Sequence, residues 1–322
     1  MNLTRIAIIF ILITAPFMMT SYMDTLTLQK SEEVKQQYTL LINNAVHDGA
    51  VALKQSAEYI DSDGSNKHIF IDGQEVVDVI LRSYHYGFNA ISPSDHIRLD
   101  QHILALVIIG YDGFYIYGTR EVTDPSGNKV LQPMLSEKYF YSYEDGDYRM
   151  NVTLDDYVRV LNKHTLIESK GRVSDLAYLP VGFNPGDYEE QRLKIIRDAL
   201  IKELNYTVSV HNRYSQGLGL AYEFYLPLGD EHAWSSDIED VGVMAFIQGH
   251  PLGGRQTLDM MAFSQSELMV QERVIAYVDG GGKPYYCVET CHHAITDTPV
   301  KIFASAQEAA MEGFYPCHMV GK

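Results

Sequence analysis

The last part of the chain gathers the residues most capable of chemistry. Its only three cysteines are Cys287, Cys291 and Cys317, and His292, His293 and His318 lie between or beside them. Thiolates and imidazoles are the usual ligands of tetrahedral zinc, and structural sites often combine three cysteines with one histidine. The spacing therefore predicts a structural zinc site of Cys287, Cys291, Cys317 and His318, with His292 or water as alternative fourth ligands.

If this part of the chain faces an oxidising compartment, the three cysteines have alternatives to zinc binding. Cys287 and Cys291 could pair as a disulfide and leave Cys317 as a thiol, or all three could be buried thiols. A zinc ion with an open coordination position could be catalytic. No obvious general base lies nearby in the sequence, which favours the structural role.

The segments around these cysteines resemble a known class of metal-binding module. Residues 284–291 end in Cys-Val-Glu-Thr-Cys, and residues 303–317 run from Phe-Ala-Ser-Ala-Gln-Glu to Tyr-Pro-Cys. The pattern resembles the small Cys/His tail of some secreted nucleases and the Ada-type metal-binding fold, from residue 283 onward. The resemblance implies a zinc-bound module, with Val320 where the pattern has its last cysteine. It implies no nuclease activity, because the rest of the chain has no nuclease motif.

The rest of the chain must position this module, and its first feature is an apolar run at the N-terminus. Arg5 precedes the run Ile6–Met19, which is short for a spanning helix and also compatible with the core of a signal peptide. Small residues are poorly placed for signal peptidase, so we expect an uncleaved anchor over residues 1–23. Arg5 before the run and acidic residues after it predict a single-pass protein of the cell membrane, with its N-terminus inside and its bulk outside.

A helical stalk is predicted to follow over residues 24–61. Apolar side chains recur there at helical spacing, namely Val34, Tyr38, Leu41, Ala45, Leu53, Ala57 and Ile60. The helix could continue the anchor without a break. Over about the first 60 residues this resembles the pilin and pseudopilin plan, but the processing signature of pilins is missing, and a plain stalk is the simpler interpretation.

Composition predicts a folded body that does not bind nucleic acid. The chain has 46% hydrophobic residues, and 42 acidic against 25 basic residues give a net charge of −17. This charge repels phosphate backbones. The excess of 23 Tyr over 1 Trp suits a sheet that packs internally or contacts other proteins.

The body is expected to be α+β over residues 62–278, with the Cys/His module over 279–322. Antiparallel strands are predicted around a buried strand at 102–109, with hairpin turns at Asp112-Gly113 and Asp145-Gly146. Helices are predicted at 74–86, from Thr153 through Leu161, and at 188–206. Loops are predicted at three places: up to and including Pro93, at 211–219 and at 249–255. A strand is predicted at 220–226.

Functional motifs are otherwise missing from the sequence. It contains no nucleophile elbow, phosphate loop or zinc-protease helix, and the acidic residues at 230–240 lack calcium-loop spacing. We expect a membrane-anchored extracytoplasmic binding or assembly protein, for example of a surface or secretion apparatus, that contacts lipid and other proteins. The alternatives are a membrane-anchored metal-dependent hydrolase and a pilin-like subunit.

Overall fold

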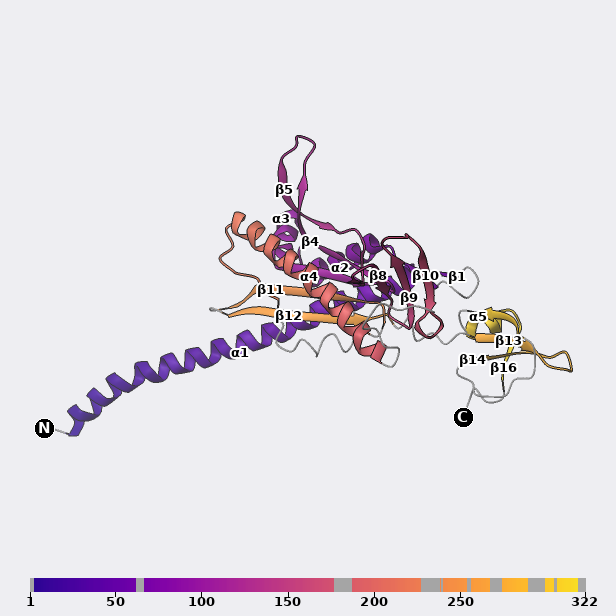
Figure 1. Cartoon of the computed structure of the whole chain (residues 1–322). Helices are drawn as coiled ribbons and strands as arrows, with labels where there is room; N and C mark the ends of the chain where they lie inside the picture. Colours follow the sequence, from indigo (N-terminus) through magenta and orange to yellow (C-terminus); the bar gives the residue numbers. More distant parts are fainter. Residues whose placement is uncertain are drawn as a thin grey trace. The chain divides into compact units, whose positions relative to one another are not determined.

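A computed structural model describes most of the chain. The described residues are 3–61, 67–176, 187–226, 238, 240–253, 256–266, 274–288, 299–303 and 306–317, without the side chains of 3–9, 11–12, 58–61, 67–70, 288 and 306–308. Two compact units are formed by residues 1–266 and 267–322. A long N-terminal helix, antiparallel sheets and packed helices confirm the α+β class (Figure 1).

Helix α1 (Leu3–Ser56) spans the predicted anchor and nearly all of the predicted stalk as one helix that includes Pro16. Its C-terminal part packs against α2, β11 and β12. The side chains buried there are Ile42, Ala45, Val46, Ala50 and Leu53. The helix stops before the predicted end at Ile60, because the short strand β1 (Glu58–Asp61) pairs with β2 (Lys67–Phe70).

The central sheet of the first unit is antiparallel. Its strands are β3 (Ile103–Ile109), β4 (Gly113–Thr123), β5 (Lys129–Leu135), β6 (Tyr139–Phe140), β11 (Gly242–Gly253) and β12 (Gln256–Gln265). Their order is β12-β11-β3-β4-β5, and β6 pairs with β4. Every residue of β3 is buried, which confirms the predicted central strand. The predicted Asp112-Gly113 turn joins β3 to β4.

Helices cover both faces of this sheet. Helix α2 (Gly73–Gly87) begins with Gly73 against Ile108 of β3. On the opposite face, Gly118 of β4 lies against α4 (Tyr188–Gly217), where an added Cβ would be 2.9 Å from Thr207 Cγ2. Successive side chains of a strand point to opposite faces of the sheet. Because α2 covers one face and α4 the other, both sets of side chains in β3 are buried, which explains why β3 is apolar throughout.

A smaller antiparallel sheet corrects one predicted helix. It has the order β10-β9-β8-β7, with β7 (Ser142–Asp145), β8 (Tyr148–Val152), β9 (Tyr157–Asn162) and β10 (Glu168–Arg172). The predicted hairpin at Asp145-Gly146 is confirmed. The predicted helix from Thr153 through Leu161 is wrong, because Tyr157–Asn162 pairs with β8. Thr153 Oγ1 donates to the Tyr157 carbonyl at 2.7 Å and so closes a turn between strands.

Two segments predicted to be loops are helical. Helix α3 (Pro93–Asp100) starts at a capping box of Ser92 and Asp95, a pattern that the sequence analysis missed. Helix α4 begins where predicted but continues to Gly217. His211, expected in a solvated loop, is only 1% exposed because α4 turns it toward the sheet. The predicted strand at 220–226 is irregular.

Strand β11 replaces the surface loop predicted at 249–255, where residues 249–253 are described. A β-bulge lies between Ile247 and His250, and Gly249 adopts φ +72° there. His250 and Leu252 are each 7% exposed. Glycine serves this bulge because few side chains tolerate a positive φ.

The second unit is a small sheet with one helix. Its strands are β13 (Val274–Val278), β14 (Pro284–Val288), β15 (Pro299–Phe303) and β16 (Tyr315–Pro316), in the order β15-β13-β14-β16. The short helix α5 (Ala306–Met311) follows β15, and Gly313, with φ +87°, lies just after the helix. The core contains Val274, Ala276, Tyr286, Phe303 and Ala309.

Some predictions concern residues that the structure does not describe. Within the described part, no helix is long and apolar enough to cross a membrane. The side chains of Ile6–Ile9, Ile11 and Leu12, which belong to the predicted anchor, are outside it. So are residues 230–237 and Glu239 of the acidic segment.

Candidate functional site

Two of the four predicted metal ligands are placed, and they lie side by side. Cys287 is in β14 and Cys317 directly follows β16. These strands pair in parallel, with Tyr286 opposite Pro316, and the Cys317 N–H donates to the Tyr286 carbonyl at 2.9 Å. Cys287 is 2% exposed, and Cys317 is half-buried. The fold thus joins two cysteines that are thirty positions apart in sequence.

The other predicted ligands, Cys291 and His318, lie outside the described residues, as do His292 and His293. In the described ranges no group of three His, Cys, Asp or Glu side chains is close enough to hold a metal ion. Two thiols on neighbouring strands suit either soft-metal coordination or disulfide chemistry.

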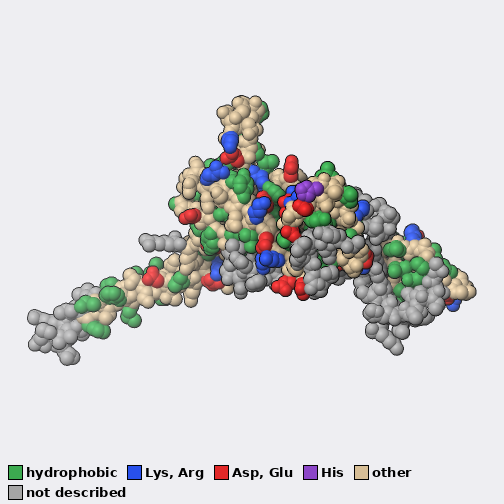
Figure 2. All heavy atoms as spheres, viewed as in Figure 1, with side chains coloured by type: hydrophobic (Ala, Val, Ile, Leu, Met, Phe, Trp, Pro, Cys, Tyr) green, Lys and Arg blue, Asp and Glu red, His purple; other side chains and the backbone are tan. Residues whose placement is uncertain are grey.

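A second feature is the apolar surface of α1. Between Phe10 and Leu28, the large apolar side chains that the structure describes are 53% to 74% exposed, as in Phe17, Met18 and Tyr22, except for the half-buried Leu26. Figure 2 shows hydrophobic side chains on this part of the helix. Three successive residues, Phe17, Met18 and Met19, are among them, and successive positions differ by about 100° around a helix. The apolar surface therefore extends around the helix instead of forming one stripe.

The threonines of this segment bond within the helix. Thr14, Thr25 and Thr27 each donate their hydroxyl to the carbonyl four residues earlier, all at 2.8 Å. Thr20 does the same to Pro16 at 3.0 Å. A hydroxyl that is satisfied internally costs less to place in an apolar environment. This part of α1 is therefore compatible with apolar surroundings despite its polar residues.

A groove of about 520 Å³ lies between α4 and the strands β6 to β8. Aromatic side chains from Phe114, Tyr139, Phe140 and Tyr143 line one part of it. Phe140 is 48% exposed. Charged side chains of both signs line the rest, namely Lys138, Glu144, Arg149, Asp198, Lys202 and Glu203. An aromatic surface with a polar, mixed-charge rim is the usual composition of a protein-binding site.

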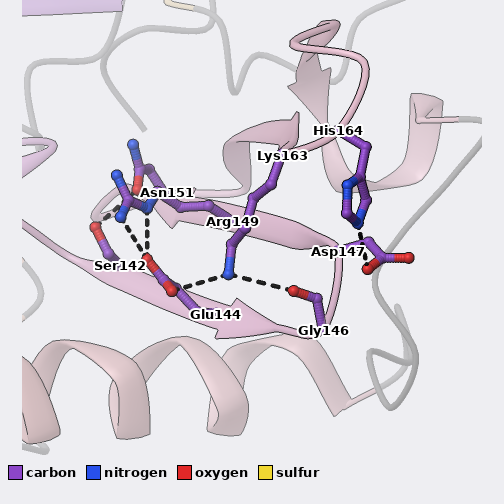
Figure 3. Close-up of polar contacts among 8 residues, drawn as sticks. All are labelled: Ser142, Glu144, Gly146, Asp147, Arg149, Asn151, Lys163 and His164. Atoms are coloured by element: carbon purple, nitrogen blue, oxygen red, sulfur yellow. Dashed lines mark hydrogen bonds and ion pairs between the residues drawn. The ribbon is translucent and has the colours of Figure 1, made fainter.

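Ion pairs fix the β7–β8 hairpin along this groove (Figure 3). Glu144 accepts from Arg149 Nε at 2.7 Å and from Lys163 Nζ at 2.9 Å. Lys163 and Arg149 thereby lower the pKa of the Glu144 carboxyl. Lys163 also donates to the Gly146 carbonyl at 3.3 Å, which ties β9 to the hairpin turn. Because these charged groups are exposed, their ion pairs fix the geometry of the hairpin but contribute little to the stability of the fold.

Among the described strands, β7 is an edge of its sheet, since β8 is its one neighbour in the order β10-β9-β8-β7. An edge strand beside a groove can accept an extended peptide as an additional strand. The geometry therefore suits binding of a protein segment.

Sequence reasoning missed this groove. Tyr139, Tyr141 and Tyr143 alternate visibly in the sequence, but α4, which closes the other side, follows them by more than forty positions. The alternating tyrosines before the Asp145-Gly146 turn were the one available signal.

No protein-family model, curated protein or solved structure matches the chain.

Proposed function

We propose that the protein is a single-pass, membrane-anchored binding or assembly protein whose body faces outward. The observation that carries the proposal is the exposed apolar surface around the N-terminal half of α1. A helix that is apolar all round needs the core of a larger assembly or a bilayer around it. Internal bonding of its threonines supports the bilayer, because a polar group without a partner is costly there.

The body would act by contacting other proteins. The groove between α4 and β7 offers the exposed ring of Phe140, two half-buried tyrosines, charges of both signs and an edge strand. A helix that continues from the anchor into the buried face of the body, as α1 does with Ile42, Ala45 and Leu53, would hold this groove at a fixed distance from the membrane surface. This role makes the protein a tethered partner in a surface or secretion apparatus.

Membrane fractionation of the full chain expressed in bacteria tests the anchor. The double variant Phe17→Asp/Met18→Asp should move from the membrane pellet to the soluble fraction, because each mid-bilayer Asp costs roughly 2.5–3.5 kcal/mol. Leu166→Asp is the matched control, since Leu166 and Phe17 are both 74% exposed, and it should stay in the pellet. A wild-type chain that carbonate extracts from membranes would refute the anchor.

Orientation is tested on intact spheroplasts. Protease added outside should degrade the body, whereas a cytoplasmic control protein survives. Protection of the body until lysis would reverse the proposed orientation.

We also propose that the second unit holds one structural zinc ion through Cys287, Cys291, Cys317 and His318. The adjacent positions of Cys287 and Cys317 in β14 and after β16 support this. Protein purified without chelator should contain about one zinc per chain, and Cys317→Ser should lose it. No metal together with a single titratable thiol would indicate a disulfide instead. Zinc with an exchangeable water ligand would favour the hydrolase alternative.

A further inference from the structure

A second cavity, separate from the groove at β7, adjoins α3. It has a volume of about 450 Å³, within the range of about 300–1,000 Å³ typical of small-molecule sites. The residues that matter are Phe88, Asn89, Arg98, Gln101, His102 and His250. They come from the end of α2, from α3, from the start of β3 and from the bulge of β11. The bulge is what brings His250 to this cavity.

His250 is an unexplained polar group in this wall. It is only 7% exposed, and within the described structure neither ring nitrogen forms a hydrogen bond. Burial, with the neighbouring His102 as a smaller cause, lowers the pKa of His250 to about 4, and the Pro251 carbonyl opposes this shift. The ring packs on Tyr38 at 4.7 Å and on Phe88 at 5.1 Å between centroids. A phenyl ring would satisfy this packing, so the imidazole needs another explanation.

His102 lies 4.9 Å from His250 between ring centroids. Its Nδ1 is 3.2 Å from the Gln248 carbonyl, and a carbonyl can only accept, so Nδ1 carries the proton. This bond fixes the ring, and burial lowers its pKa. Both imidazoles are therefore neutral at pH 7, and their charges add nothing to the cavity.

The cation at the cavity is Arg98. Its side chain is 79% exposed and lies 3.8 Å from Asp95, beyond hydrogen-bond distance. The Asp95 carboxylate already accepts from Ser92 Oγ at 2.6 Å and from Ser92 N at 3.3 Å. The guanidinium thus has donors to spare, and Asn89 and Gln101 add amide N–H groups. Asp95 also lines this wall, and apart from its carboxylate the charged and amide side chains supply donors, whereas Phe88, Leu99 and Pro251 supply apolar surface.

Helix α3 is lightly packed over this cavity. None of its residues is buried, and Ile97 is 56% exposed. It contacts α2 through the 2.7 Å bond between His85 Nε2 and Asp100 and through the stacking of His96 on His85, with 4.0 Å between ring centroids. Segments with little buried surface open at low free-energy cost, and lids over ligands are drawn from them.

We propose that this cavity binds a small organic carboxylate with an apolar body, and that α3 closes over it. Arg98 and the two amides would bind the carboxylate, and Phe88, Leu99 and Pro251 would contact the apolar body. Both His250 ring nitrogens are enclosed in this structure, so His250 would offer one of them to the ligand only after α3 shifts. Since Tyr38 of α1 packs directly on His250, the occupied site would adjoin the helix that leads to the membrane. This site goes beyond the proposed anchor and partner groove and depends on neither.

Titration of the full chain in detergent micelles with sodium benzoate tests the proposal. Calorimetry should show saturable binding to the wild type, and benzamide, which has the same ring without the charge, should bind at least about tenfold more weakly. Arg98→Gln and His250→Phe should each weaken benzoate binding by at least about tenfold. Arg172→Gln is the control, because Arg172 is also exposed (63%) but lies in β10, and it should bind like the wild type.

Hydrogen exchange measured on the same samples tests the lid. Saturating benzoate should slow exchange in residues 91–101 and leave residues 188–204 of α4 unchanged. Absence of saturable benzoate binding would overturn the proposal, and so would binding that Arg98→Gln leaves intact. Arg98 is exposed, so this variant should fold even if His250→Phe does not.

Discussion

Acid should destabilise the body through the buried side chain of His211. This residue is 1% exposed. Its Nε2 is 3.1 Å from the Gln101 carbonyl, so Nε2 donates, and its Nδ1 accepts from Thr119 Oγ1 at 3.0 Å. In the neutral ring, each nitrogen therefore forms one hydrogen bond. A second proton on Nδ1 would force the Thr119 hydroxyl to reverse its role from donor to acceptor and would bury a charge.

The magnitude follows from linkage. Burial lowers the pKa of His211 from 6.5 to about 4 in the folded state. The unfolded chain therefore binds more protons between these values, so stability is full above pH 6.5 and falls as the pH drops toward 4. At about 1.36 kcal/mol per pKa unit, the loss is about 2 kcal/mol from pH 7 to pH 5 and approaches about 3 kcal/mol by pH 4.

Urea unfolding of the full chain in detergent at pH 7, 6 and 5 measures this loss. His211→Gln keeps a donor and an acceptor but does not titrate, so its free energy of unfolding should fall by about 2 kcal/mol less than that of the wild type over this range. His164→Gln is the control, because the His164 side chain is 73% exposed and should leave the pH dependence unchanged. If His211→Gln had the wild-type pH dependence, the neutral buried ring would be refuted.

Further predictions concern the bulge and the ion-pair network. Gly249→Ala should destabilise the body by about 1–3 kcal/mol, because Gly249 has φ +72° and a Cβ would lie 2.8 Å from Tyr222 Cγ; urea unfolding that gave wild-type stability would contradict this. Glu144→Gln should change unfolding by less than about 1 kcal/mol, since its partners Arg149 and Lys163 are solvent-accessible; a larger loss would indicate that the hairpin depends on this network.

Local patterns predicted the elements whose side chains decide their own conformation. Continuous apolarity identified Ile103–Ile109 as a buried strand, and Asp-Gly pairs identified both hairpin turns. Helical spacing identified α2 and the start of α4. These signals work because strand and helix periods are properties of neighbouring residues.

The errors share a different cause. Tyr157–Asn162 has apolar residues that fit either period, and pairing with β8 selects the strand. The sequence around His211 suggests a loop, but α4 includes this residue and places its ring beside Thr119 of β4. The glycines at 249 and 253 suggest a loop, but pairing with β12 makes this stretch a bulged strand, with Gly249 in the bulge. In each case a partner distant in sequence overrides local propensity.

The sequence by itself determined the α+β class, the central strand, the apolar N-terminal helix and the clustering of thiols near the end of the chain. These depend on composition and on spacing between neighbours. Only the tertiary structure decided that Cys287 lies beside Cys317, that α4 closes a groove at β7, and that a bulge buries His250 beside Tyr38. Such juxtapositions arise from packing between distant segments, where burial and steric fit select one arrangement among many that the local pattern allows.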